Sequence, residues 1–487
     1  MKTDEKQLSV NRTAAAPGDD DDVGSERATV TAGLPPHAGE LSKRALFLRD
    51  VFLVLAVAWA ARILFMLIVP PEARSFDVTS WEAVAKTLES GGNPYQETSW
   101  LNWPPFWMQL IYVISKTAAV LGIPFLRALQ IFLVLIESFV IIGLFKLVRA
   151  VAPAANARKI IIIGLALNPV AILLVCLHCN FDILVALWLV LFMDRLLRYN
   201  RHNETTDWLA ACLFLGLGVL TKTVPLILVP LLAGGFRRVT PNAKFLGLNL
   251  LFGPVALGMS VIYVLAPIDV TAKVIAYQSI GGFFGVSGLL YLAGIDTLIT
   301  PYSALFCLLL VVVMTLSSVW FWRRQSIGDR ETILFGALLL AAIPALGPGY
   351  GPQYIYWFLP FLIVSYAACG GYWRWILTGF WLTSVGTYLV EYALFQGHGM
   401  YLYNILAHAQ MMSQAQLVLA WGQKWSTHTG QTLVRLPLFV AYLVLLVSGA
   451  SSLFRNVNRE WWMDGSAGKA GKQNRAENDQ RCASPRD

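Results

Sequence analysis

Residues Arg74 to Trp107 read RSFDVTSWEAVAKTLESGGNPYQETSWLNWPPFW, and this stretch is the longest polar interruption near the start of an otherwise apolar chain. It holds the acidic residues Asp77, Glu82, Glu89 and Glu97, in a chain that has few charges elsewhere. The way in which its Trp-Pro-Pro end meets a membrane decides the topology of everything that follows. We expect the stretch to hold the chemistry and the later helices to present substrates to it.

The composition indicates an all-α protein that crosses a membrane many times. Of the 487 residues, 56% are hydrophobic and 14% are charged, whereas soluble domains carry roughly 25% charged residues. Apolar runs of about 20 residues recur, and each is long enough to cross a bilayer as a helix. The net charge of +8 comes mainly from Lys and Arg at the ends of these runs. We therefore expect the lipid bilayer, and no nucleic acid, as a partner. The six scattered Cys indicate no disulfide framework.

The apolar runs predict about twelve transmembrane helices. The predicted spans are 45–69, 126–149, 159–177, 181–198, 207–221, 223–235, 244–266, 301–323, 331–347, 353–369, 373–395 and 433–454. The run 104–121 is assigned to a re-entrant or surface helix, because counting it as a crossing would place every later basic cluster outside. Without it, the basic loops are cytoplasmic, as the positive-inside bias requires. Arg62, inside the first span, is expected to face an outer cavity or to snorkel.

This topology divides the chain into four parts. Residues 1–44 and 455–487 are polar and are predicted to be disordered cytoplasmic tails, with no cleavable signal peptide visible in residues 1–42. Residues 45–395 form a transmembrane catalytic module. Residues 396–454 add an outer loop and the last transmembrane helix, so that both termini are cytoplasmic.

Polar residues that hydropathy does not explain gather on the outer face in this topology. They are Asp77, His178, Asp182, Lys222, Tyr277, Gln278 and the run GPGYGPQY at 347–354. Their one-sided distribution predicts a functional site on that face.

Asp77 follows the first span closely and precedes an amphipathic segment. As a structural residue it would be a helix N-cap or a first-turn acid. As a functional residue it would be a general base that takes a proton from a hydroxyl group. One carboxylate is enough for a transfer whose leaving group is already a phosphate. Glu82, about one turn further on, is the second candidate for the base.

Lys222 lies between two apolar runs, where a Lys at bilayer depth costs about 2.5–3.5 kcal/mol. It is either an interfacial Lys that snorkels or the partner of a lipid phosphate. Asp182 is either a helix N-cap or an acid that orients Lys222 or a donor hydroxyl. Cys176, His178 and Cys179 suggest metal ligands, but no second ligand pair follows at the spacing of zinc sites. We therefore expect no cofactor, and a divalent metal ion is the one alternative.

Several short motifs, taken in order, resemble those of the GT-C superfamily of integral-membrane glycosyltransferases. They are Ser75-Phe76-Asp77, Gly92-Asn93-Pro94-Tyr95, Trp103-Pro104-Pro105, His178-Cys179-Asn180-Phe181-Asp182, Thr221-Lys222-x-x-Pro225 and Gly351-x-Gln353-Tyr354. The resemblance covers roughly residues 50–400. It is greatest to bacterial mannosyltransferases that use polyprenol-phosphate-mannose, with the dolichyl-phosphate-sugar enzymes next. Trp103 stands where the family has a Tyr, and Cys179 stands where relatives often have a small residue.

The resemblance implies an inverting hexosyltransferase that moves a sugar, mannose first, from a polyprenyl-phosphate donor to a glycolipid or glycan acceptor on the outer or lumenal face. Asp77 would be the base and Lys222 would lie near the donor phosphate. The other site candidates are Asp182, His178, Gln353 and Tyr354 for the donor, and Glu82, Tyr95 and Trp103 for the substrate. The location would be the plasma membrane of a bacterium, or the ER membrane of a eukaryote.

A membrane transporter or flippase of lipid-linked sugars is the alternative. Such a protein needs charged or polar groups near the middle of the bilayer, whereas the charges of this chain lie mostly at the ends of the predicted spans. A lipid-modifying transferase is a third hypothesis, and it would normally show more metal-binding carboxylates.

Overall fold

The computed structural model describes residues 36–98, 101–152, 154–265, 267–270, 273–274, 283–324, 328–368, 371–395 and 400–453. The chain falls into two compact units, Met1–Arg49 and Asp50–Asp487. In the first unit the described residues 36–49 are helical and belong to α1 (Pro36–Ile68). This helix begins before Ala45, the predicted start of the first span. The rest of the predicted tails, 1–35 and 454–487, lies outside the described residues, as do Tyr277 and Gln278.

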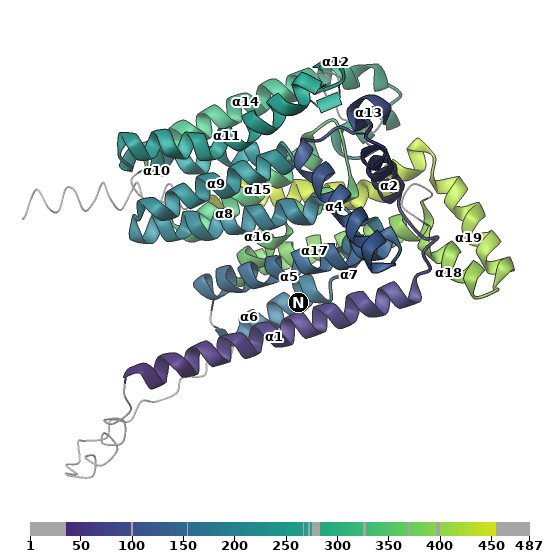
Figure 1. The fold of residues 1–487 in the computed structure, drawn as a ribbon, viewed down its shortest axis with the longest axis horizontal. Coiled ribbons are helices and arrows are strands. Elements are labelled where there is room, and N and C mark those ends of the chain that lie inside the picture. The colour runs from purple at the N-terminus through teal and green to yellow at the C-terminus, as the bar shows by residue number, and fades with distance from the viewer. Residues whose placement is uncertain are drawn as a thin grey trace, which may run out of the picture. The chain divides into compact units, whose positions relative to one another are not determined.

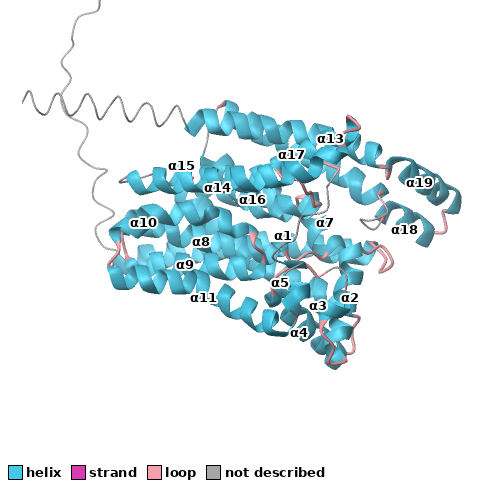
Figure 2. Ribbon diagram, turned by 90° about the horizontal axis from the view of Figure 1, so that it is seen from above, coloured by secondary structure: helices cyan, strands magenta, loops and turns pink. Residues whose placement is uncertain are grey.

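The second unit consists of helices of very different length. After α1 they are α2 (Phe76–Glu89), α3 (Pro94–Glu97), α4 (Pro105–Leu121), α5 (Phe125–Val151), α6 (Ala154–Ile161), the π-helix η1 (Ile162–Ala166), α7 (Pro169–Leu173), the π-helix η2 (Leu174–His178), α8 (Asp182–His202), α9 (Thr205–Thr221), the 3-10 helix η3 (Val224–Leu232), α10 (Ala233–Arg238), α11 (Pro241–Leu265), α12 (Pro267–Val270), α13 (Gly285–Leu292), the 3-10 helix η5 (Asp296–Leu298), α14 (Ile299–Arg323), α15 (Asp329–Leu346), the 3-10 helix η6 (Pro352–Tyr354), α16 (Ile355–Ala368), α17 (Tyr372–Leu394), α18 (Tyr401–His408), α19 (Met412–Trp425) and a C-terminal helix, His428–Leu453. The long helices run side by side, with α10 at one end and α2, α18 and α19 at the other (Figure 1, Figure 2).

Five helices in the described part of the chain are long and apolar enough to cross a membrane. They are Arg44–Ile68, Phe125–Val151, Pro241–Val264, Asp296–Arg323 and His428–Leu453, and a bent helix pair would be a sixth span. The prediction of an all-α, multi-pass membrane protein is confirmed, whereas the count of about twelve spans is not. Only 6% of the apolar window of Asp296–Arg323 is buried, so the described part of the chain leaves most of this helix uncovered.

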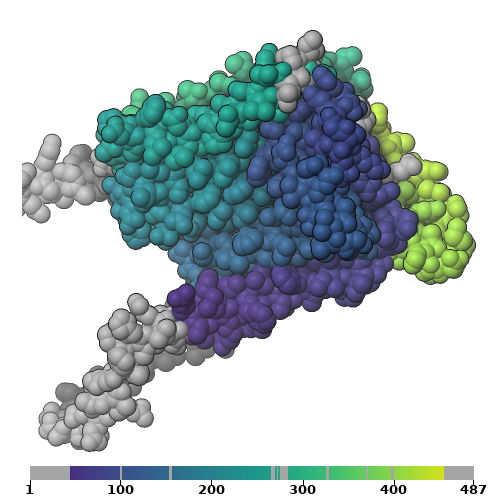
Figure 3. Space-filling view, viewed as in Figure 1, coloured from purple at the N-terminus to yellow at the C-terminus, as the bar shows by residue number. Residues whose placement is uncertain are grey.

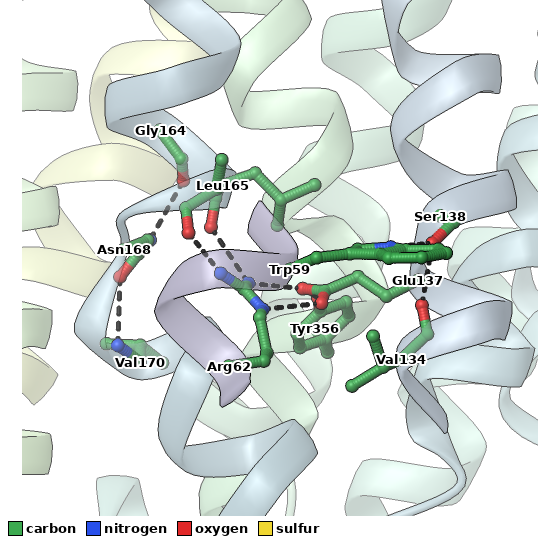
Figure 4. Close-up of polar contacts among 11 residues, drawn as sticks. Trp59, Arg62, Val134, Glu137, Ser138, Gly164, Leu165, Asn168, Val170 and Tyr356 are labelled. Atoms are coloured by element: carbon green, nitrogen blue, oxygen red, sulfur yellow. Dashed lines mark hydrogen bonds and ion pairs between the residues drawn. The ribbon is translucent and has the colours of Figure 1, made fainter. Parts of the chain in front are cut away.

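The predicted span 159–177 is not one continuous helix, because the chain bends by 47° between Asn156–Ala166 and Pro169–His178. Pro169 begins α7, and its ring nitrogen has no hydrogen to donate to the preceding turn. Asn168 caps the new helix: its side-chain oxygen accepts a hydrogen bond from the backbone N–H of Val170 at 2.9 Å, and its amide donates to the Gly164 carbonyl (Figure 4). The predicted span 223–235 also differs, since it is the 3-10 helix η3 followed by α10.

The side chain of Arg62 in α1 binds the backbone at this bend (Figure 4). Its guanidinium donates to the carbonyl oxygens of Leu165 and Ala166, just before the break, and to both oxygens of the Glu137 carboxylate at 2.6 and 2.7 Å. The hydroxyl of Tyr356 donates to the same carboxylate at 2.7 Å. The side chains of Arg62 and Glu137 are 0% and 1% exposed. The prediction that Arg62 faces a cavity or snorkels is therefore wrong, and Glu137 supplies the partner that a buried charge requires.

Helix α4 corresponds to the predicted re-entrant or surface helix 104–121. Its 17 residues are fewer than the roughly 20 that a crossing needs, and Gly122 ends it in the left-handed conformation. The helix packs against α2, α5, α9 and α11 (Figure 3, dark blue beside teal). Near the start of α5, the Gln130 side chain donates to the Cys176 carbonyl at 2.5 Å. The first turns of α5 therefore lie beside η2, the segment that ends at His178.

Candidate active site

Helix α2 holds Asp77 in its first turn, so the prediction of a first-turn acid is confirmed. A carboxylate at this position interacts favourably with the helix dipole. Ser75 is the N-cap residue, but its hydroxyl donates to the carbonyl of His178 at 2.8 Å instead of capping the helix. The indole N–H of Trp81 donates to the carbonyl of Cys179 at 3.3 Å. These two contacts fasten the start of α2 to the loop that links η2 and α8.

That loop turns back on itself so that its side chains surround Asp77. Cys179 has a φ of 54°, in the left-handed region. The side-chain oxygen of Asn180 accepts a hydrogen bond from the backbone N–H of Asp182 at 2.9 Å, and thereby takes the place of a capping side chain at the start of α8. Asp182 is consequently not the N-cap of α8, a position that Phe181 occupies. The Asp182 carboxylate is left for another partner.

Two side chains of the loop donate to the same oxygen of Asp77. The Nε2 atom of His178 lies 2.8 Å from Oδ2 of Asp77, and the amide nitrogen of Asn180 lies 2.6 Å from it. Within the described part of the chain, no donor pairs with Oδ1. The Asp77 side chain is 27% exposed, so Oδ1 remains accessible to a substrate.

The same contacts set the protonation of Asp77. Burial raises the pKa of this carboxyl, but the charge of His178, hydrogen bonds from His178 and Asn180, and the charge of Lys222 outweigh burial and hold the pKa below its ordinary value. Asp77 is therefore a carboxylate at neutral pH. Because a carboxylate only accepts hydrogen bonds, Nε2 of His178 carries the proton of their contact, and Nδ1 faces the hydroxyl of Tyr392 in α17.

Lys222 is held by one carboxylate and a set of aromatic rings. Its ammonium nitrogen lies 2.8 and 3.1 Å from the two carboxylate oxygens of Asp182, whose side chain is 1% exposed. The same nitrogen lies 5.1 Å from the ring centroids of Phe181, Tyr354 and Trp357. The sequence left two interpretations of Asp182 open, a helix N-cap or an acid that orients Lys222 or a donor hydroxyl. The structure shows its pairing with Lys222. The Lys222 side chain is 19% exposed, so the cation can also reach a ligand.

A cavity of about 560 Å³ joins these groups, a size within the range of small-molecule sites. Of the site residues predicted from sequence, Asp77, Trp103, Lys222, Gln353 and Tyr354 line it. His178 and Asp182 are buried behind the lining and contact it through Asp77 and Lys222. The indole nitrogen of Trp103 and the side-chain oxygen of Gln353 are buried and have no hydrogen-bond partner among the described residues. Such unpaired groups are costly unless a ligand or water satisfies them.

Besides His178 and Asp182, two more predicted site residues do not line the cavity. Glu82 accepts hydrogen bonds from Arg74 at 3.0 and 3.2 Å on an exposed face of α2, one turn beyond Asp77 and pointing elsewhere. Tyr95 is buried, and its hydroxyl donates to the carbonyl of Trp103 at 3.0 Å. Tyr95 therefore supports the Trp103 segment from behind and does not contact a ligand in the cavity.

Several residues of the site were not predicted. Asn180 lies inside the His178–Asp182 motif, and its position between two singled-out residues was a usable signal. No signal in the sequence singled out Tyr392, since a Tyr within an apolar run is common. The C-terminal helix also reaches the site: Arg435 pairs with Glu391, the neighbour of Tyr392, and its guanidinium lies 4.9 Å from the ring centroid of Tyr350 in the cavity wall.

The described residues contain no group of three or more His, Cys, Asp and Glu side chains that could hold a metal ion. Cys176 and Cys179 are both buried, and the Cys179 thiol faces the Cys176 carbonyl at 3.6 Å. The chemistry that this arrangement supports rests on an ionised carboxylate, a paired lysine and aromatic surfaces.

The fold and the cavity together define a multi-pass membrane protein with a cavity lined by an acidic and a basic side chain, Asp77 and Lys222. No family model matches the chain, and no curated protein matches it in sequence. Among solved structures, the chain is similar to ArnT from Cupriavidus metallidurans, whose crystal structure has undecaprenyl phosphate bound. The identity is 14% and the TM-score is 0.46, over 83% of this chain and 78% of that chain.

Proposed function

We propose that the protein is an inverting glycosyltransferase of the GT-C type. In this proposal it transfers a hexose, with mannose as the first candidate, from a polyprenyl-phosphate donor to a hydroxyl group of a glycolipid or glycan. The reaction takes place on the outer face of the plasma membrane. The observation that carries the proposal is the placement of Asp77 and Lys222 in one cavity, with the order of motifs along the sequence as independent support.

Asp77 is suited to act as the general base. Both of its donors occupy Oδ2, which leaves Oδ1 to accept the proton of the acceptor hydroxyl. As that proton transfers, the hydroxyl oxygen attacks the anomeric carbon of the donor sugar from the face opposite the phosphate. The new C–O bond forms while the bond between the anomeric carbon and the phosphate oxygen breaks, so the configuration inverts.

Lys222 is suited to hold the leaving group. Charge develops on the phosphate as the glycosidic bond breaks, and a positioned cation in a partly dry site stabilises that charge. The phosphate leaves as a stable anion and needs no proton from an acid, which fits a site with one ionised base. The rings of Phe181, Tyr354 and Trp357 surround the ammonium group and give a sugar apolar faces on which to stack.

The test is an assay of the purified protein in lipid nanodiscs with a panel of polyprenyl-phosphate sugars and glycolipid acceptors. We expect one donor to give a covalent product, detected by mass spectrometry, with inverted anomeric configuration by NMR. The Asp77→Asn variant should form it about a hundredfold to ten-thousandfold more slowly, while it folds and binds donor as the parent does. A product of retained configuration, or normal turnover by Asp77→Asn, would exclude this mechanism.

The flippase remains the second candidate, and the buried pairs Arg62–Glu137 and Arg435–Glu391 are the observation that favours it, since charges deep in a membrane protein often serve transport. In both pairs the two charges contact each other, however, and none of the four residues lines the cavity. Movement of a labelled lipid-linked sugar across a vesicle membrane without any covalent product would support the flippase.

A further inference from the structure

A second cavity, of about 400 Å³, lies between the α6–α7 segment, α16 and α17. We infer that it binds one acyl chain of an anionic phospholipid, with the headgroup phosphate at Lys159 and Arg374. The cavity is separate from the proposed active site, because the two share no lining residue.

Both basic side chains lie at the same end of this groove. Lys159 belongs to α6 and Arg374 to the first turn of α17, and both are exposed. The Arg374 guanidinium lies 5.7 Å from the ring centroid of Tyr366, near the end of α16, which holds it at the groove mouth. None of the described residues that line the groove is acidic. The end formed by these residues therefore favours an anion.

The rest of the groove is apolar. Its lining includes Ile160, Ile163, Leu359, Leu362, Ile363 and Leu377. Ile163 is 48% exposed, so the groove is open on one side, as a lipid chain that enters from the bilayer requires. The indole nitrogen of Trp381, further along the groove, is buried without a hydrogen-bond partner among the described residues. An ester oxygen of a lipid would supply that acceptor.

The length of the groove fits one leaflet. From Arg374 to Ser384 it follows α17 for about 15 Å, at a rise of roughly 1.5 Å per residue. This distance is about half of the ~30 Å hydrocarbon core. A chain that lies in the groove therefore reaches the middle of the bilayer and does not cross it.

The groove mouth lies at the end of α16 that is away from the Asp77 cavity. Helix α16 begins at Ile355, next to the cavity residue Tyr354, and Tyr366 lies close to its other end. The headgroup consequently lies at the end of the groove away from the proposed active site. The bend at Pro169 contributes to the groove, because Gly164, Asn168 and Val170 around it are all lining residues.

The test measures lipid binding to the detergent-purified full chain by native mass spectrometry. The probes are phosphatidylglycerol and phosphatidylcholine with identical chains. We expect phosphatidylglycerol to bind roughly twenty-five-fold more tightly, since each of the two basic residues near an anionic headgroup contributes about fivefold. The Lys159→Gln/Arg374→Gln variant should lose that preference. The control Arg323→Gln/Arg330→Gln removes two exposed basic residues outside the groove and should keep the preference.

A second variant tests the apolar part independently. Thr378→Trp fills the groove and should abolish tight phosphatidylglycerol binding, whereas Thr383→Trp, on the same helix but outside the lining, should not. Undiminished binding by both Lys159→Gln/Arg374→Gln and Thr378→Trp would overturn the inference. It would also be overturned if Thr378→Trp lost binding of added polyprenyl phosphate while it kept that of phosphatidylglycerol, since the groove would then hold a polyprenyl chain.

Discussion

The Nε2 atom of His178 lies 2.8 Å from Oδ2 of Asp77, although the two residues are 101 positions apart in the chain. The contact joins the first polar loop to the end of a bent helix pair. The Ser75 hydroxyl joins the same two segments a second time, because it donates a hydrogen bond to the backbone carbonyl of His178. The position of the proposed base is therefore set by the η2–α8 loop as much as by its own helix, and changes in that loop should alter the chemistry of Asp77.

Asp77→Asn should reduce sugar transfer by about a hundredfold to ten-thousandfold, the usual contribution of a positioned general base. The amide retains the shape of the side chain and an oxygen that accepts from His178 and Asn180, so folding should be preserved. The measurement is kcat for transfer, with the KM for the donor unchanged. Glu82→Gln is the matched control, because Glu82 lies outside the cavity, and its kcat should stay within about twofold of the parent. Equal losses in both variants would contradict the role of Asp77.

The pH dependence of transfer should report the contact between His178 and Asp77. Since the pKa of Asp77 is held below its ordinary value, the acid limb of kcat/KM should lie below the unperturbed value of about 3.9. In His178→Gln the charge that lowers the pKa is lost while burial, which raises it, remains. The acid limb should therefore move to higher pH. Tyr392→Phe leaves the His178–Asp77 contact in place and should move the limb less. An unshifted limb in His178→Gln would argue against this coupling.

Lys222→Met should lose both activity and stability, and a second substitution should separate the two. Removing the ammonium leaves the buried Asp182 carboxylate without its partner, which costs about 3–5 kcal/mol. Lys222→Met/Asp182→Asn removes the uncompensated charge, so its melting temperature should recover toward that of the parent. Transfer should stay low in both variants. Lys116→Met, which breaks an exposed pair with Glu89, should change neither property, and recovery of transfer by the double variant would contradict a phosphate-binding role for Lys222.

The residues of the site that could be predicted share one property: they are polar where the surrounding sequence is apolar. Asp77, His178, Asp182 and Lys222 all stand out in this way, and the structure brings them together. Glu82 stands out equally, but it points away from the cavity. Helical periodicity gives the spacing of residues along α2, whereas the direction of its site face depends on the packing of Trp81 against Trp103, Trp107 and Phe181.

The limits of the fold prediction have a similar cause. Hydropathy identified the apolar segments, and the all-helical membrane architecture followed from them. Hydropathy does not register the missing N–H of Pro169, so it could not show that the segment around this residue bends. Nor could it show that Arg62 turns inward, because that depends on Glu137 in a helix far along the chain. A buried ion pair is recognisable only when both partners are known to face each other.

Arg62→Met should destabilise the fold strongly, by about 3–5 kcal/mol, because Glu137 would remain as an unpaired buried charge. Arg62→Met/Glu137→Leu should be less destabilised than the single variant. The measurement is thermal unfolding of the detergent-purified protein. Arg74→Met is the control: its partner is Glu82, their side chains are 44% and 25% exposed, and such surface pairs contribute about 0–1 kcal/mol. A loss in Arg62→Met no larger than that in Arg74→Met would show that the bend does not depend on the pair.

Cys307 gives direct chemical access to the cavity. Its thiol is exposed and lies in the cavity wall on α14, whereas Cys176, Cys179 and Cys212 are buried. In a background with Cys369 and Cys482 replaced by Ser, a membrane-impermeant maleimide added from the outer face should label Cys307 and inhibit transfer, because the adduct occupies part of the cavity that Lys222 also lines. Excess polyprenyl phosphate should slow the labelling, and Cys307→Ala should be insensitive to the reagent. Labelling from the cytoplasmic face alone would contradict the predicted orientation in the membrane. Full activity of the labelled protein would show that the cavity takes no part in the reaction.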